Sequence, residues 1–541
     1  MNFGRGAPPT LPRLLALLAV LSVALGFGVD RWARETKGPL DRAREFANEG
    51  YYGRAEAEYL VLARQRPASV PVLVELLDNH EALRVSLGPA LGMGAAPEDA
   101  PIGSVGRGGD ASGADESPID AVLSAPDLPP DVALLGRWWR EVDALDVQDA
   151  DAALVIALAA ADPPAPWANH LLGREAERHH KFETAAERYA REAGAFGDRR
   201  EDAERASAIW IEAGHWDRLA EALGSPTFVR QVGADVRHRE ALHRHDWLAA
   251  MRWFFPAQYE GATLGVLALA SISGLAWFVI CAQVGLVRER WRMRVPLYVA
   301  AFVLGVASTY VVLGVAALEQ GLLGLREKGN PLQDAIYFVV GVGLREELAK
   351  ALLLLPLVPI VRTWGRRREA LACGALVGLG FAAEENLGYF HTAPSAAFAR
   401  FLTANFLHVS TTGLVAVAID DAARGREDRP GDLSRTLMLV IAAHGLYDFF
   451  LSSAPVEGSS FLSMLVFIFL TRRFVDVLRT LPGREGPLLY LFGVGLVVVA
   501  GASFVYACAW VGPQHAAVAL LEGGLGVGIV IFVFIQELAN I

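Results

Sequence analysis

The segment 332–361 places charged side chains in the middle of a run that is otherwise apolar enough to cross a membrane. Glu346, Glu347 and Lys350 lie within it, and about 20 mainly apolar residues suffice for a transmembrane helix. Ionisable groups at membrane depth are costly, so they normally face a bundle interior or a wet cavity and mark a functional site. This feature therefore predicts a membrane helix bundle with a polar site inside it.

The composition agrees with a chain that has both soluble and membrane-embedded parts. Of 541 residues, 53% are hydrophobic and 20% are charged, and most of the charge lies in the first half. The net charge of −11 argues against a nucleic-acid partner, because phosphates would repel the protein. The three cysteines, Cys281, Cys373 and Cys508, all fall in predicted spans, so we expect no disulfide framework.

Residues 1–37 are predicted to be a signal anchor or a signal peptide. Arg5 and Arg13 precede an apolar run over 14–29, which is the charge pattern of a secretory signal. Small residues near the end of this run would allow cleavage. We interpret the segment as an uncleaved anchor.

Residues 38–258 are predicted to form a helical domain with repeat-like pairs of helices. One stretch has the small residues, aromatics and final proline of a tetratricopeptide-type second helix: Gly50, Tyr52, Ala55, Tyr59, Leu62 and Pro67. A weaker copy comprises Gly173, Phe182, Ala185 and Tyr189. Spaced aromatics also occur in ordinary helical cores, so an ordinary helical domain is the alternative. Residues 88–118 are rich in Gly, Ala, Pro, Ser and Asp and indicate a flexible insertion.

The chain from 259 to 541 is predicted to be a polytopic membrane domain with a core at 332–451. Nine spans are expected near 263–286, 295–316, 332–361, 369–390, 398–419, 435–452, 459–471, 487–511 and 514–536. Arginine-rich connectors follow the first, third, fifth and seventh spans, and the positive-inside rule makes these connectors cytoplasmic. We therefore expect an all-α, multi-pass cell-membrane protein whose residues 38–258 are extracytoplasmic and whose C-terminus is cytoplasmic.

Polar residues recur in the three spans that follow Glu346 and Glu347. They are Glu384, Glu385 and Asn386 in one span, His408 in the next, and His444 with Asp448 in the third. Glu346 and Lys350 are four residues apart, as are His444 and Asp448, so each pair shares a helix face and can interact. A carboxylate beside an imidazole holds the ring in one tautomer.

This set of side chains suits the activation of water. A glutamate enclosed by helices can act as a general base, and imidazole and amide groups can stabilise the oxyanion that forms at a peptide carbonyl. Alternatively, His408, His444 and a glutamate could bind zinc, whose bound water would be the nucleophile. The sequence has no His-Glu-x-x-His motif, so the metal-dependent version has no separate support.

Four motifs, one on each of these spans, resemble those of PrsW-type intramembrane proteases, which are related to the CAAX prenyl endopeptidases. They are Glu346-Glu347-Leu-Ala-Lys350, Phe381-Ala-Ala-Glu384-Glu385-Asn386, His408 and His444-Gly-Leu-Tyr-Asp448. The resemblance implies an endopeptidase that cuts within or beside the membrane. It also implies a membrane-anchored protein substrate, since PrsW itself cleaves an anti-sigma factor. The large N-terminal domain is outside the family's minimal core, so the substrate could differ.

The resemblance further implies a role for each polar residue. Glu346 would be the water-activating base, with Glu347 as its partner. Glu385 and His408 would complete the water or metal site, and any ion would be held by Glu385, His408 and His444. His444 would stabilise the oxyanion together with the amide of Asn386. Lys350 and Asp448 would support these groups.

Two other functions fit the same residues. Carboxylate and imidazole chains also form the proton relays of coupled transporters, although the spans lack the internal repetition that many transporters show. A catalytically inactive membrane scaffold with a tetratricopeptide-like binding domain is the third possibility. A Glu346→Gln variant separates the three: it should lose reporter cleavage if the chain is a protease, lose flux if it is a transporter, and lose neither if it is a scaffold.

Overall fold

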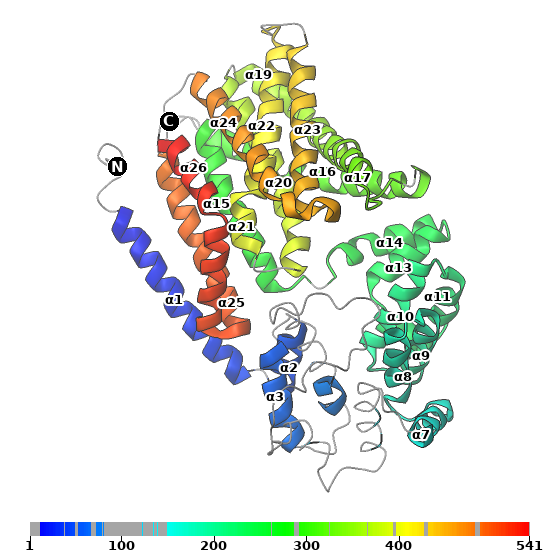
Figure 1. The fold of residues 1–541 in the computed structure, drawn as a ribbon. Coiled ribbons are helices and arrows are strands. Elements are labelled where there is room, and N and C mark those ends of the chain that lie inside the picture. Colours follow the sequence, from blue (N-terminus) through cyan, green and yellow to red (C-terminus); the bar gives the residue numbers. More distant parts are fainter. Residues whose placement is uncertain are drawn as a thin grey trace. The chain divides into compact units, whose positions relative to one another are not determined.

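In a computed structural model, the chain is helical, and the residues that the structure describes contain no strand (Figure 1). The structure describes residues 11–36, 38–48, 52–65, 72–77, 79, 122, 134, 138, 149–260, 262–285, 291–323, 325–364, 366–392, 396–426, 431–481 and 487–539. The expected insertion at 88–118, and Gly50 and Pro67 of the expected repeat, lie outside them. The chain divides into two compact units, Ala33–Glu260 and Met1–Trp32 with Gly261–Ile541.

The unit Ala33–Glu260 is built from short helices that pack on their neighbours in sequence. They are α2 (Pro39–Asn48), α3 (Tyr52–Gln65), α7 (Asp149–Ala160), α8 (Ala168–Arg178), α9 (Phe182–Ala195), α10 (Arg200–Ala213), α11 (Trp216–Leu223), α12 (Pro226–Gln231), α13 (Ala234–His243) and α14 (Trp247–Gln258). Two apolar clusters form its core, one around Tyr59, Leu76 and Trp138 and one around Tyr189 and Trp210.

The weaker repeat-like stretch brings α8 and α9 into close contact. A Cβ atom on Gly173 would lie 2.7 Å from the ring of Tyr189, so only glycine permits this approach. Ala185 and Tyr189 are fully buried, whereas Phe182 is 48% exposed. Three of the four expected positions therefore lie in the helix interface, and a tetratricopeptide-like fold for the unit stays a prediction.

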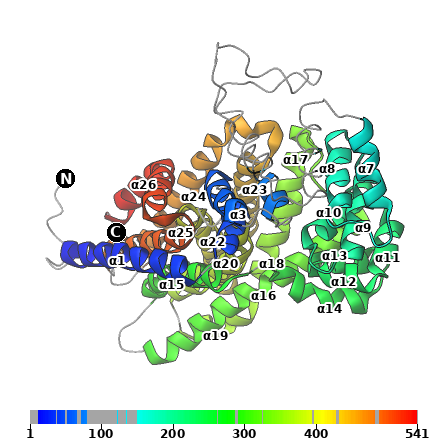
Figure 2. The same ribbon diagram turned by 90° about the horizontal axis from the view of Figure 1, so that it is seen from below.

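The second unit is a bundle whose central helices are α20 (Arg367–Thr392) and α22 (Ala404–Ala423), as Figure 2 shows. Around them lie α15 (Leu264–Gly285), α16 (Trp291–Leu323), α18 (Leu344–Leu354), α21 (Ala397–Leu402), α23 (Asp432–Ser452), α24 (Phe461–Thr480), α25 (Leu488–Gly526) and α26 (Gly528–Ala539). The N-terminal helix α1 (Leu11–Thr36) packs on α25, where a Cβ on Gly26 would lie 2.6 Å from the ring of Phe504.

Five helices of the described chain are long and apolar enough to cross a membrane, or six if one bent pair is a single span. The five are Leu264–Gly285, Arg292–Ala316, Arg367–Phe390, Ala397–Ala423 and Leu488–Ala509, and the bent pair is Gly512–Gly526 with Gly528–Ala539. Three of the nine expected spans do not meet this criterion of length and apolar composition. Two of these, near 435–452 and 459–471, do contain the long helices α23 and α24, both of which carry charged residues.

The third, 332–361, was expected to be one helix, and the structure corrects this. It consists of α17 (Pro331–Ile336), a π-helical segment η3 (Tyr337–Gly343), α18, a 3₁₀ turn η4 (Leu355–Leu357) and α19 (Val358–Trp364). A π segment inside a helix is unfavourable and often occurs at a functional site. Here it immediately precedes Glu346 and Glu347.

Glycines set the spacing of α20 and α22. A Cβ atom on Gly378 would overlap the carbonyl oxygen of His408, and one on Gly374 would lie 2.6 Å from the carbonyl oxygen of Thr412. Since any larger residue would push the helices apart, this contact fixes the depth at which His408 meets the neighbouring helices.

Candidate active site

The polar residues predicted from sequence converge at one place in the second unit. Glu346, Glu347 and Lys350 lie on α18, Glu385 and Asn386 on α20, His408 on α22, and His444 and Asp448 on α23. The start of α18 approaches α23 closely, because a Cβ on Gly343 would lie 2.6 Å from the carbonyl oxygen of Ile441. The cluster is thus assembled from four helices.

Glu347 is the centre of this cluster. Its Oε1 atom accepts hydrogen bonds from Lys350 Nζ at 2.7 Å and from Thr411 Oγ1 at 3.2 Å, and it lies 2.7 Å from His444 Nδ1. Lys350 Nζ is 3.9 Å from Glu346, so the expected pairing of Glu346 with Lys350 is replaced by a shorter one with Glu347. Glu347 therefore holds the other groups in position.

Glu346 is bound far less tightly. Its Oε2 atom lies 3.6 Å from His444 Nε2, and it is buried without accepting a hydrogen bond from any described residue. Leaving a buried carboxylate oxygen without a donor destabilises a fold by about 1–3 kcal/mol. An oxygen in this state is suited to accept a proton from water or to bind a cation.

His444 has a carboxylate at each ring nitrogen. Nδ1 contacts Glu347, whereas Nε2 lies 3.3 Å from Asp448 Oδ2 and faces Glu346. The sequence predicts that Asp448 holds the tautomer, but the shorter contact belongs to Glu347. A ring that donates from Nδ1 to Glu347 presents Nε2 to the space beside Glu346.

His408 is placed by a lysine and a carboxylate. Lys350 Nζ lies 2.9 Å from its Nδ1 atom and Glu385 Oε2 lies 3.3 Å from its Nε2 atom. An ammonium group only donates, so a neutral ring in this arrangement accepts at Nδ1 and carries its proton on Nε2. Lys350 is completely buried and lies 4.4 Å from the centre of the Phe381 ring.

Arg400, on α21, belongs to the site and is missing from the sequence-based set. Its guanidinium donates to Glu385 Oε2 at 2.7 Å and to Asn386 Oδ1 at 2.6 Å, and it stacks 3.6 Å from the centre of the Tyr389 ring. An arginine inside the predicted span 398–419 is a charged group in an apolar segment, but its place near the end of the span makes this signal weaker than that of Glu346 in mid-span.

The amide side chain of Asn386 is hydrogen-bonded to neighbouring side chains of the site. Its Nδ2 atom donates to Asn405 Oδ1 at 2.7 Å, and Asn405 Nδ2 donates to Ser273 Oγ at 2.9 Å. With its oxygen bound to Arg400, the amide acts as a support for the Arg400–Glu385 pair. The expected role of Asn386 as an oxyanion donor stays a prediction, because these contacts occupy its oxygen and one hydrogen of its amide nitrogen.

The region 294–472, which contains all of these residues except Ser273, matches the model of a family described as PrsW family intramembrane metalloprotease. The chain contains a PrsW-family intramembrane protease domain. A comparison with curated proteins and with solved structures finds no match to this chain. The four motifs that resemble PrsW-type proteases in sequence thus lie within the matched region and meet in one cluster.

The PrsW-family domain has residues that fit a metal ion, as the family description implies. Glu346, His408 and His444 each offer a ligand atom, and these atoms all lie within 4.8 Å of one another. Two imidazoles and a carboxylate are a common ligand set for catalytic zinc, and the buried oxygen of Glu346 that lacks a hydrogen-bond donor supports the fit.

The set expected from the sequence is Glu385, His408 and His444. In the structure Glu346 takes the place of Glu385, because Glu385 is paired with Arg400. Metal binding through Nε2 of His408 also has one chemical requirement. A nitrogen that binds a metal carries no proton, so the neutral ring must change to the tautomer that has its proton on Nδ1, and Lys350 can then no longer donate to Nδ1.

Proposed function

We propose that this PrsW-like peptidase hydrolyses peptide bonds of membrane-associated proteins with a water molecule that Glu346 activates. One observation carries the proposal: Glu346 Oε2 is buried beside His444 Nε2 and accepts no hydrogen bond from the described residues. The other charged groups of the cluster each make a hydrogen bond or a close ion pair with a described residue, although Oε2 of Glu347 is likewise buried without a partner among them. Glu346 is therefore the carboxylate of the cluster that no hydrogen bond holds in place and that is available to a reacting molecule.

The reaction assigns one task to each group. Water attacks the carbonyl carbon of the scissile bond while Glu346 takes one of its protons. His444, in its protonated form, donates from Nε2 to the oxyanion, and Glu347 accepts from Nδ1. When the C–N bond breaks, Glu346 passes its proton to the leaving amine, so the products are a carboxylic acid and an amine and the enzyme is regenerated.

A divalent ion would use the same residues but would change the tasks of two of them, since Glu346 and His444 would become its ligands. Glu346, His408 and His444 would hold it, and when bound it would polarise water and offset the negative charge of the oxyanion in place of the proton on His444 Nε2. The other residues keep their tasks: Glu347 orients His444, Lys350 balances the charge of Glu347, and Arg400 holds Glu385 against His408.

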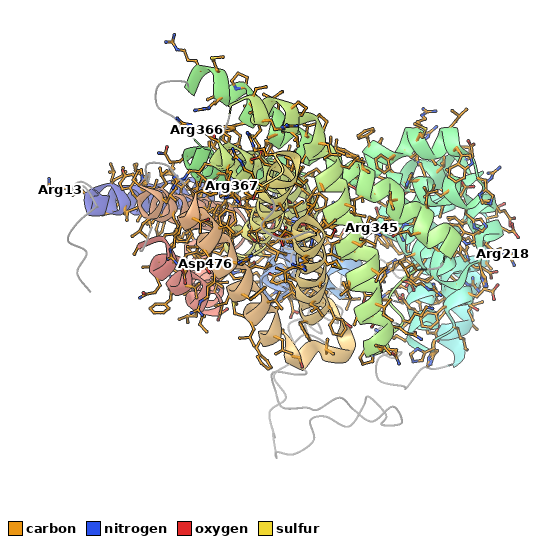
Figure 3. All side chains as sticks on the ribbon, turned by 90° about the horizontal axis from the view of Figure 1, so that it is seen from above. Arg13, Arg218, Arg345, Arg366, Arg367 and Asp476 are labelled. Atoms are coloured by element: carbon orange, nitrogen blue, oxygen red, sulfur yellow. The ribbon has the colours of Figure 1, made fainter. Side chains whose placement is uncertain are left out.

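The substrate and the topology are part of the proposal. Arginine-rich connectors, such as the one with Arg366 and Arg367 at the start of α20 (Figure 3), favour a cytoplasmic location for that end of the bundle. Residues 33–260 would then be extracytoplasmic, where a tetratricopeptide-like unit could recruit a membrane-anchored, anti-sigma-factor-like protein. Such a protein would enter the site laterally from the bilayer.

Comparative membrane proteomics tests the activity without knowledge of the substrate. Cells that produce the wild-type chain should contain new protein termini near predicted membrane boundaries, and the Glu346→Gln variant should lack them. Glu522→Gln is the matched control, because Glu522 is an exposed glutamate of α25 in the same unit. Identical sets of termini with the wild type and Glu346→Gln would contradict the proposal, and flux of protons in liposomes that depends on Glu346 would instead favour a transporter.

A further inference from the structure

Helix α14 exposes a continuous apolar face. Trp247, Leu248, Met251 and Phe255 are 57%, 83%, 75% and 55% exposed, and their spacing places them on one side of a helix. The opposite side packs on α13 (Figure 1). Ala250 of α14 is 3% exposed there, and its carbonyl oxygen lies 2.9 Å from Nδ1 of His238 on α13. Helix α14 is therefore fixed to α13 on one side and exposes its apolar side chains on the other.

This concentration of exposed apolar side chains is specific to α14. In the described part of Ala33–Glu260, the other large hydrophobic residues that are well exposed are distributed over α3, α7 and α9: Val61, Leu154, Ile156 and Phe182. Single exposed hydrophobic residues are normal, but a contiguous group marks an interaction surface.

The short connection from α14 to α15 shows that the membrane surface is close to α14. Glu260, two residues after α14, is fixed to its own unit: Oε2 accepts from the backbone N–H groups of Ala234 at 2.6 Å and Asp235 at 3.2 Å, and Oε1 from Arg200 at 3.1 Å. The membrane-spanning helix α15 begins at Leu264. Four residue steps reach at most about 14 Å, so the end of α14 stays close to the bilayer surface.

The composition of the face suits that surface. Trp and Phe are enriched where the headgroups meet the hydrocarbon, and an in-plane amphipathic helix inserts such side chains while a basic residue contacts the headgroups. Arg252, next to Met251, is exposed and can serve as that basic residue.

We propose that α14 is an interfacial helix whose apolar face, Trp247, Leu248, Met251 and Phe255, inserts into the lipid surface at the leaflet where α15 enters. The interaction keeps the unit Ala33–Glu260 against the membrane. The inference is independent of the proteolytic activity, because it uses no residue of the polar cluster.

Spin labels in the full chain test this proposal. The three native cysteines are buried, and a cysteine-free background with alanine at these positions accepts a single label at Leu248→Cys, or at Phe182→Cys as the exposed apolar control in the same unit. In nanodiscs of phosphatidylcholine and phosphatidylglycerol, the ratio of oxygen to nickel-chelate collision rates should be several-fold higher at position 248 than at 182. Met251→Cys gives a second label on the same face if the first variant does not fold.

Two results would overturn the proposal. Equal ratios at 248, 251 and 182 would show that the face is in water. Low collision rates with both reagents, together with dipolar broadening that disappears when labelled chains are diluted with unlabelled ones, would show that a second copy covers it.

Discussion

Each unit of this chain buries a histidine among carboxylates, yet the two clusters are built differently. In the unit Ala33–Glu260, His170 Nδ1 lies 2.6 Å from Asp202 Oδ1, and both side chains are 1% exposed. Nearby Glu192 is fully buried and accepts from the backbone N–H groups of Trp167 at 2.6 Å and Asn169 at 3.2 Å. Burial raises the pKa of Glu192 above its ordinary value.

The membrane cluster differs in how its carboxylates are satisfied. Both oxygens of Glu192 are held by backbone donors of the same unit, which makes the group a fixed part of the fold. Glu346 Oε2 receives no donor from the described residues and faces histidines from two other helices. A buried histidine and a buried carboxylate are therefore common to both clusters, whereas the missing donor at Glu346 Oε2 distinguishes the membrane cluster.

The largest expected difference is between the two glutamates. Glu346→Gln should lower cleavage of a substrate by about 10²–10⁴-fold, the usual contribution of a general base. Glu192→Gln should leave the rate per folded molecule unchanged and lower the stability of its unit by about 1–3 kcal/mol, because the amide cannot accept at both positions. Cleavage assays and thermal unfolding of the same preparations check both parts, and a catalytic loss in Glu192→Gln would remove the distinction.

Metal content sharpens the comparison further. We expect the purified chain to carry a divalent ion in near-stoichiometric amount, and His408→Ala to lose it. His170→Ala, the matched change in the other unit, should retain the ion because His170 contacts Asp202 there and is none of the three candidate ligands. Elemental analysis measures this directly, and an ion content that is the same in both variants would contradict a site at His408.

Arg400 should have a smaller, positioning effect. Arg400→Lys and Arg400→Gln should each lower kcat/KM by about 10–100-fold, the usual effect of residues that orient a site, since lysine cannot make the two-point contact with Glu385 and Asn386. The loss should appear mainly in kcat. Arg218→Gln is the control, because Arg218 is an exposed arginine of the other unit (Figure 3). A loss confined to KM would indicate a role in binding instead.

The smallest effect is expected at a hydroxyl. Thr411→Val removes the 3.2 Å hydrogen bond to Glu347 and should lower cleavage by about 2–10-fold, which corresponds to one ordinary hydrogen bond. Thr412→Val, one residue on, removes a buried hydroxyl that has no hydrogen-bond partner among the described residues, so it should be neutral or slightly stabilising. Equal losses in both variants would indicate a packing effect.

Much of this arrangement is predictable from sequence because membrane depth penalises every polar group. That penalty identifies Glu346, Glu385, His408 and His444 as a set, and the structure brings them together. Hydropathy likewise locates the apolar spans. It fails at 332–361. The π segment packs closely on α23, where a Cβ on Gly445 would lie 2.5 Å from the carbonyl oxygen of Phe338, and the 3₁₀ turn contains Pro356, a local signal that hydropathy does not register.

Pairings within the site are harder to predict. Glu346 and Glu347 both lie within reach of Lys350 along the helix, and the contact of Lys350 with His408 and Phe381 decides between them. Arg400 lies near the end of a span, where an arginine ordinarily extends toward the membrane surface. Only the tertiary fold shows that it turns to Glu385.

The central claim is that Glu346 and His444 act as one catalytic unit, and a double-mutant cycle tests it most directly. kcat/KM would be measured for Glu346→Gln, His444→Asn and the double variant on one cleavable substrate. Residues that act together are non-additive, so the double variant should be no slower than the slower single variant. A double variant whose loss equals the product of the two single losses would contradict the account.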